Sequence, residues 1–170
     1  MDALFRHEQP GYWTGWRGLA HSSVEWCEVN YETCDWIAEF FNTTSSLAIV
    51  CAGLFGLLFN RTKETEPRFI LAYAAIVAVG VGSIAFHMTM LAPMQMLDEV
   101  PMLYSAQIMV YTLLEGDTVE PRHGKKLPIA LGVHAVVITL LTTLTSGRLQ
   151  FLCFHASFGS MEFFARRDRP

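Results

Sequence analysis

Charged side chains are scarce in this sequence. Asp, Glu, Lys and Arg make up 16% of its 170 residues, whereas soluble domains carry about 25%. With 52% apolar residues, this deficit favours a membrane protein. Two further absences exclude other classes. The four cysteines do not have the paired spacing of a zinc knuckle, and no basic block accompanies the net charge of −4, so nucleic acid is not an expected partner.

Long apolar runs are what the sequence has instead. Four of them approach the ~17–25 residues that a helix needs to cross a bilayer: Phe41–Phe59, Phe69–Leu91, Met94–Leu114 and Leu127–Leu144. A fifth run, Phe151–Phe164, is shorter and meets the polar sequence "ARRDRP". Either a helix cut short or a surface segment fits it. We therefore expect an all-α integral membrane protein with four to five transmembrane helices.

The expected organisation is a single membrane domain over residues 1–170. It consists of an acidic segment over 1–39, transmembrane helices within 40–164 and a basic tail over 165–170. If all five runs cross, nine of the twelve Lys and Arg residues fall on the side of residues 60–68, 115–126 and 165–170. Basic residues accumulate on the cytoplasmic side of membrane proteins, so the N-terminus is expected to be non-cytoplasmic.

Three polar side chains stand where the second and third apolar runs meet. Ser83 and His87 are spaced i, i+4 and share a helix face, and the short "LAPM" connection brings Asp98 opposite them. A hydroxyl, an imidazole and a carboxylate near a wet membrane end suit a metal-activated water. The alternative is structural: Ser83 bonds to its own helix, and His87 pairs with Asp98. Glu99 points about 100° away and is expected to face solvent or a partner.

Oxygen donors are dense in the acidic segment before the first helix. Glu25, Glu28 and Asn30 alternate closely, Glu39 follows, and the Trp26 carbonyl lies between them. Calcium prefers about six to eight oxygen ligands of this mixed kind. Acidic residues ahead of a helix also stabilise its N-terminal dipole, so a solvated acidic face remains the alternative to a calcium site.

These two regions together resemble the alkaline ceramidase family of membrane amidases. The likeness rests on "EWCEVNY" and "IAEFFNTTSS", followed by "GSIAFHMTMLAPMQMLDEVPMLY", and it is collinear from about Glu25 to at least Tyr111. The resemblance implies a seven-helix membrane bundle in the endoplasmic reticulum or Golgi. It also implies cleavage of the amide bond of ceramide to sphingosine and a fatty acid, by a water that zinc activates.

The resemblance assigns roles to eight residues. Ser83 and Asp98 match the catalytic serine and aspartate, and His87 matches the first zinc histidine. The calcium ligands of the family match Glu25, Trp26 (through its carbonyl), Glu28, Asn30 and Glu39. Glu25 stands where an aspartate is common. The expected partners are a ceramide-type substrate and membrane lipids.

The zinc site departs from the family pattern. The family takes its other two zinc ligands from a late His-x-x-x-His motif, and no two of the six histidines here are four apart. Catalytic zinc usually needs about three protein ligands, and one is matched. We therefore expect a C-terminally truncated member, an incomplete version of the seven-helix bundle, that holds calcium more readily than zinc. The alternative is a catalytically inactive membrane subunit or lipid-binding remnant that keeps the calcium site and pairs with a full-length homologue.

Overall fold

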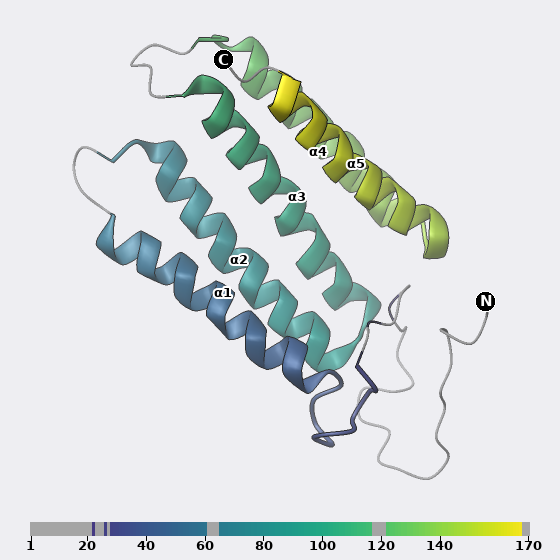
Figure 1. The fold of residues 1–170 in the computed structure, drawn as a ribbon. Coiled ribbons are helices and arrows are strands. Elements are labelled where there is room, and N and C mark those ends of the chain that lie inside the picture. The colour runs from purple at the N-terminus through teal and green to yellow at the C-terminus, as the bar shows by residue number, and fades with distance from the viewer. Residues whose placement is uncertain (1–21, 23–25, 27, 61–64, 117–121, 168–170) are drawn as a thin grey trace.

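Five α-helices make up the computed structural model, which describes Ser22, Trp26 and residues 28–60, 65–116 and 122–167 (Figure 1). They are α1 (Phe40–Phe59), α2 (Pro67–Thr89), α3 (Ala92–Glu115), α4 (Lys126–Leu144) and α5 (Gly147–Arg167). No strand occurs among these residues. The predicted all-helical class is confirmed, and the fifth apolar run lies in a helix of 21 residues.

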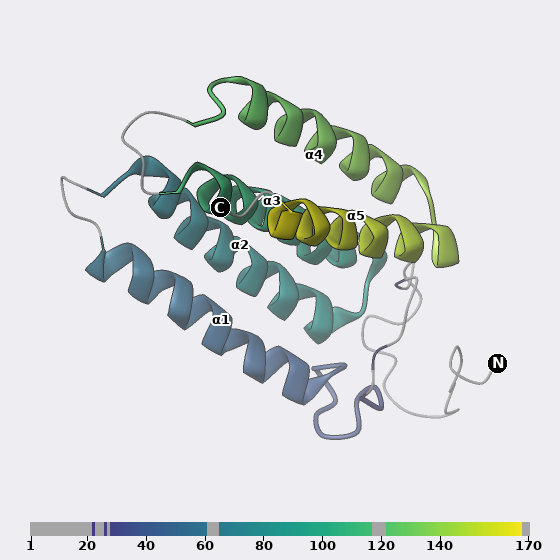
Figure 2. The same ribbon diagram turned by 45° about the horizontal axis from the view of Figure 1, so that its top comes forward.

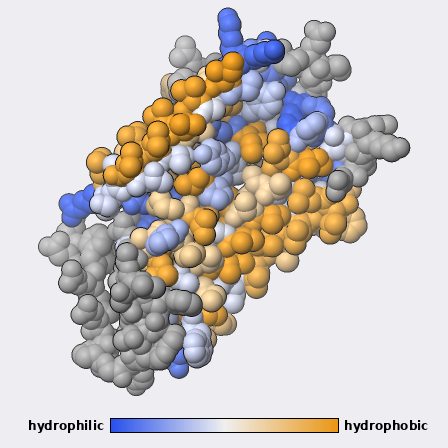
Figure 3. All heavy atoms as spheres, turned by 180° about the vertical axis from the view of Figure 1, so that it is seen from behind, coloured by the Kyte–Doolittle hydropathy of each residue, from blue (hydrophilic) through white to orange (hydrophobic). Residues whose placement is uncertain are grey.

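Three of these helices, α1, α2 and α4, are long and apolar enough to cross a membrane. Helix α3 is as long, but it carries Asp98, Glu99 and Glu115 and does not meet the same criterion in the described chain. Apolar side chains cover the long faces of the helices seen from behind (Figure 3). The protein is therefore a membrane protein.

Consecutive helices are neighbours. Helix α1 packs on α2, and α2 packs on α3 (Figure 1). Helices α4 and α5 pack on each other and on α3, which places them on the far side of α3 from α1 (Figure 2). The largest buried cluster lies between α3 and α5, and α4 adds partly buried side chains to it; its buried members are Leu103, Val110, Leu114, Phe154 and Met161.

Proline and a left-handed residue set the helix ends around the α2–α3 connection. Pro67 and Pro93 stand in the first turns of α2 and α3, where the missing N–H costs nothing. Helix α2 ends at Thr89 because Met90 adopts a left-handed conformation with φ of 53°. The apolar run that predicted this helix continued to Leu91, since hydrophobicity alone does not report the left-handed turn.

Helices α2 and α3 make backbone contact at Gly82. A Cβ atom on Gly82 would overlap the Leu97 carbonyl group and would lie 3.1 Å from the Asp98 Cα. The Leu97 carbonyl is available for this contact because Pro101, four residues on, has no N–H to donate to it. Glycine at 82 and proline at 101 together let the two helices approach closely.

Glycines also bring α1 and α2 together. A Cβ on Gly53 would lie 2.8 Å from the backbone nitrogen of Val77, and one on Gly80 would lie 2.8 Å from that of Val50. Membrane helices associate through small residues of this kind, because apolar side chains gain nothing by leaving lipid.

The segment before α1 covers the end of α2. Backbone N–H groups of Ser22, Ala38 and Glu39 donate to carbonyls of Met90, Met88 and His87 at 2.9–3.0 Å. The last carbonyls of a helix have no partner within the helix. The segment satisfies three of them and is thereby fixed against α2.

The Gly82 contact yields a stability prediction. Gly82→Val is expected to lower the free energy of unfolding by about 1–3 kcal/mol, the usual cost of overpacking, because the Leu97 backbone cannot move aside as a side chain could. Gly132→Ala in α4 is the matched control, since a Cβ there meets nothing within 4 Å. Thermal unfolding midpoints of both variants in detergent measure the difference. Equal midpoints would show that the close approach is unimportant.

Candidate functional site

Ser83 and Asp98 face each other across the α2–α3 contact. Gly82 lies against the Leu97–Asp98 backbone, so the next residue of α2 lies beside the Asp98 side chain. The Ser83 and His87 side chains are both close enough to the Asp98 carboxylate to interact with it electrostatically. The Ser83 hydroxyl hydrogen bonds to Ser46, and Asp98 Oδ1 is buried without a hydrogen-bond partner in the described residues. Both Ser83 and Asp98 are 8% exposed. The structure therefore brings together the three residues that the sequence predicted to meet.

The His87 ring is held by a carboxylate from outside α2. Its Nδ1 lies 2.6 Å from Glu39 Oε2, and the Glu39 side chain is fully buried. The rings of Trp26 and Phe86 lie beside the imidazole, with centroids 6.4 Å and 5.0 Å away. Because Nδ1 is engaged, Nε2 is the nitrogen that His87 can offer to a metal or a substrate.

Two contributors from α1 were missed by the sequence reasoning. Asn42 donates from Nδ2 to Glu39 Oε2 at 2.9 Å, and Ser46 Oγ hydrogen bonds to Ser83 Oγ at 3.1 Å. Glu39, Asn42 and Ser46 follow one another at i, i+3 and i+7, which places them on one face of a helix. That spacing was the available signal, and it marks the face of α1 that supports the site.

Glu28 acts on the first turn of α1. Its carboxylate oxygens accept hydrogen bonds from the backbone N–H groups of Phe41 at 2.9 Å and Asn42 at 2.6 Å. Glu28 thus stabilises the N-terminus of a helix, which is the alternative to calcium binding that the sequence left open. A carboxylate has about four lone-pair positions, so the two hydrogen bonds leave Glu28 able to bind a cation as well.

Asn30 and Glu39 each bury an oxygen without a hydrogen-bond partner in the described residues. These atoms are Asn30 Oδ1 and Glu39 Oε1. The Tyr31 N–H donates to the Ala38 carbonyl at 2.8 Å, which brings the two segments together. One neutral and one anionic oxygen, both unsatisfied, form the kind of donor set that calcium takes. Trp26 is 45% exposed, and the predicted ligand Glu25 lies outside the described residues.

Side chains that could bind zinc do not gather around His87 in the part of the chain that the structure describes. Within the described ranges, no three His, Cys, Asp or Glu side chains gather as a metal-binding group. His134 hydrogen bonds to Gln107 at 3.3 Å, and His155 bonds to the Phe151 carbonyl of its own helix at 2.8 Å. These two histidines therefore make other contacts. Because the same absence includes carboxylates, the described side chains alone do not form a complete site for zinc or for calcium.

Glu99 is half-buried. Its carboxylate accepts hydrogen bonds from Gln95 at 2.5 Å and from Gln150 of α5 at 3.0 Å. The acid that was expected to face solvent or a partner is therefore also bonded to a neighbouring helix of the same chain. The amide of Gln150 lies far along the chain, so sequence spacing gave no sign that Glu99 would join α3 to α5.

Comparison with known proteins identifies the family of the chain. Residues 18–166 match the Ceramidase family. The chain is 37% identical over 134 residues to alkaline ceramidase 3 of Mus musculus. This match covers 79% of the present chain and 49% of the mouse protein. It is 32% identical over 148 residues to alkaline ceramidase YPC1 of Saccharomyces cerevisiae. This match covers 82% of the present chain and 44% of the yeast protein.

A relative from Dictyostelium discoideum, the putative alkaline ceramidase dcd3A, is 31% identical over 175 residues, covering 86% of this chain and 60% of the relative. The chain spans about half the length of the curated relatives that it matches. The family match runs through all five helices and through the Ser83, His87 and Asp98 cluster. The chain belongs to the Ceramidase family.

Proposed function

We propose that this chain supplies the serine, aspartate and first histidine of an alkaline ceramidase-type amidase. The proposed reaction is hydrolysis of the N-acyl amide of ceramide to sphingosine and a fatty acid. The observation that carries the proposal is the placement of buried Ser83 and Asp98 beside the half-buried His87, at one end of an α2–α3 pair whose outer faces are apolar. A lipid amide can approach such a site from within the bilayer.

The chemistry assigned to the chain is proton transfer and oxyanion stabilisation. Asp98 takes a proton from the water that attacks the ceramide carbonyl and passes it to the leaving amine nitrogen. The Ser83 hydroxyl donates a hydrogen bond to the oxyanion that develops on the carbonyl oxygen. Ser46 orients Ser83 through their hydrogen bond, and Glu39 orients the His87 ring.

The proposal assigns no step to zinc within this chain. His87 is its one matched ligand, and catalytic zinc takes about three. Two further ligands from outside the described residues are needed before a zinc-activated water can form. We propose that calcium is the metal which the chain holds by itself, through Glu28, Asn30 and Glu39, with Glu25 and the Trp26 carbonyl.

The proposed location is the endoplasmic reticulum or Golgi membrane, with the N-terminus on the non-cytoplasmic side. Supporting this orientation, Arg68, Arg122, Lys125 and Lys126 lie at the end of the helices opposite to Ser83 and Asp98. The proposed calcium site and the proposed catalytic cluster then both face the lumen.

A second candidate function is a catalytically inactive subunit or lipid-binding remnant that pairs with a full-length homologue. The observation that favours it is the missing group of zinc ligands in the described parts of the chain. This candidate and the first share the calcium site and differ in whether hydrolysis can be restored. Metal content and complementation therefore separate them.

Calcium binding provides one test. The purified chain is expected to bind calcium in isothermal titration and to contain far less than stoichiometric zinc. Glu39→Gln is expected to weaken calcium binding by about tenfold or more, since it removes the charge of a buried ligand. Glu32→Gln is the matched control, because Glu32 is exposed in the same segment and should leave the affinity unchanged. One tightly bound zinc ion per chain would contradict the expectation.

Split-protein complementation tests the activity. Co-expression with the half of mouse alkaline ceramidase 3 that this chain does not match is expected to release fatty acid from a fluorescent ceramide. Asp98→Asn should reduce the rate by about 10²–10⁴-fold and Ser83→Ala by about 10²–10³-fold. Ser105→Ala is the control, since its hydroxyl bonds to its own helix. Calcium binding with no restored turnover would favour the inactive subunit.

A further inference from the structure

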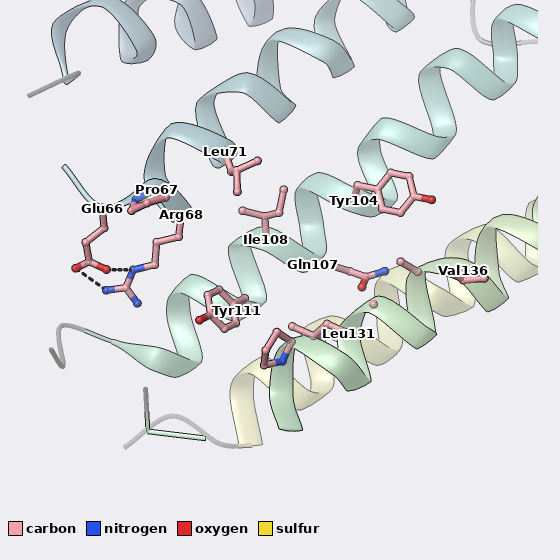
Figure 4. A pocket seen from close by; sticks show the side chains of 13 residues that line it. Glu66, Pro67, Arg68, Leu71, Tyr104, Gln107, Ile108, Tyr111, Leu131 and Val136 are labelled. Atoms are coloured by element: carbon pink, nitrogen blue, oxygen red, sulfur yellow. Dashed lines mark hydrogen bonds and ion pairs between the residues drawn. The ribbon is translucent and has the colours of Figure 1, made fainter. Parts of the chain in front are cut away.

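A groove lies on the side of α3 that faces α4. Helices α2 and α4 do not pack on each other within the described residues, although both are close to α3. The space between them has a volume of about 730 Å³ and mostly apolar walls (Figure 4). Leu71, Tyr104 and Val136 line it and are 40–56% exposed. The groove therefore opens to the surroundings along its length.

The two ends of the groove differ in polarity. At one end Arg68 Nε lies 2.7 Å from Glu66 Oε2, and Arg68 Nη2 donates to the Gly116 carbonyl at 2.7 Å. The Arg68 side chain is 10% exposed. At the other end Thr139 of α4 donates a hydrogen bond to the Tyr104 hydroxyl at 3.2 Å, which joins α3 to α4. The groove is therefore charged at one end, and at the other end a hydrogen bond between neutral hydroxyl groups joins its walls.

This groove is separate from the Ser83 and Asp98 cluster. Its α3 residues Tyr104, Ile108 and Tyr111 form a stripe at i, i+4 and i+7. At about 100° per residue, Tyr104 and Tyr111 lie roughly 120° and 140° around the helix from Asp98, and Ile108 lies roughly 80° from it. Tyr111 is also about 20 Å along the axis from Asp98 at 1.5 Å per residue. An occupant of the groove would not touch the proposed catalytic residues.

Length and charge indicate which molecule fits. Tyr104 and Gly116 lie roughly 18 Å apart along the helix axis, close to the ~15 Å hydrocarbon depth of one bilayer leaflet. Beyond the charged end, Arg122, Lys125 and Lys126 are exposed where α4 begins, and Pro128 of the same helix lines the groove. Among the described residues at this end, Glu66 and Glu115 offset two of the four basic side chains, which leaves an excess of two positive charges.

We propose that the groove binds an acyl chain of an anionic phospholipid, with the phosphate beside Arg68 and the basic start of α4. An apolar cavity of this volume lies in the usual range for small-molecule sites, and basic pockets at the cytoplasmic ends of membrane helices bind anionic headgroups. The lipid fills the gap between α2 and α4 and holds the two helices at a fixed separation. It occupies a place distinct from the proposed ceramide site.

Fluorescence quenching in vesicles tests this site. Tyr111→Trp places a reporter in the groove, and the chain without the reporter gives the background of its own tryptophans. The full chain is reconstituted in phosphatidylcholine vesicles that contain either brominated phosphatidylserine or brominated phosphatidylcholine at the same low mole fraction. Reporter quenching is expected to be several-fold stronger with the brominated anionic lipid, and raising the salt concentration is expected to reduce the difference.

Two sets of variants locate the effect. Gly132→Phe, added to the reporter chain, is expected to abolish the headgroup preference, because Gly132 lines the groove and a side chain there enters open space. Gly159→Phe is the matched control on α5, where a Cβ likewise meets nothing within 4 Å. The pair Lys125→Gln and Lys126→Gln should reduce the preference without filling the groove.

Three outcomes would overturn the proposal. Equal quenching by both brominated lipids would mean that ordinary boundary lipid passes the groove without selection. A preference that survives Gly132→Phe would place the anionic lipid elsewhere. Quenching could also be weak with both lipids and become stronger as the protein is diluted in lipid. Because dilution separates copies of the chain, that result would identify a second copy as the occupant.

Discussion

The position of the candidate site depends on one backbone contact, that of Gly82 with the Leu97 carbonyl. Glycine removes the side chain that would separate α2 from α3, and Pro101 leaves the carbonyl without its partner within the helix. A Cα–H group can meet such an oxygen favourably at a close helix crossing. Because Ser83 and Asp98 are the next residues on each side, the same contact determines their separation. The proposed chemistry rests on this proximity.

Glu39 joins the two halves of the candidate site. Its backbone N–H donates to the His87 carbonyl, while its carboxylate contacts the His87 ring and the Asn42 amide. A fully buried carboxylate with an unsatisfied oxygen is costly. A cation at Glu39 Oε1 would offset that cost and fix the imidazole at the same time. Calcium in this place would therefore act on the histidine without taking part in hydrolysis.

Hydrophobic runs predicted the first four helices, because burial in lipid demands long uninterrupted apolar segments. The shorter fifth run left a helix and a surface segment both open. The meeting of Ser83, His87 and Asp98 was also predictable, since the i, i+4 spacing and a short connection leave little freedom. The contacts of Asn42, Ser46 and Gln150 were not predicted. They depend on how helices rotate against each other, and that rotation is set by glycine contacts such as that at Gly82. Met90 escaped prediction for a different reason, because a left-handed methionine has no sequence signature.

The backbone bonds between the amino-terminal segment and α2 impose an order on biosynthesis. Ala38 and Glu39 leave the ribosome about fifty residues before the carbonyls of Met88 and His87 exist for them to bind. At about 5–20 residues per second, the segment waits for seconds with its polar groups in water. It can dock only when the far end of α2 has emerged on the same side of the membrane. Docking of this segment therefore requires that α1 and α2 have already been inserted as a hairpin.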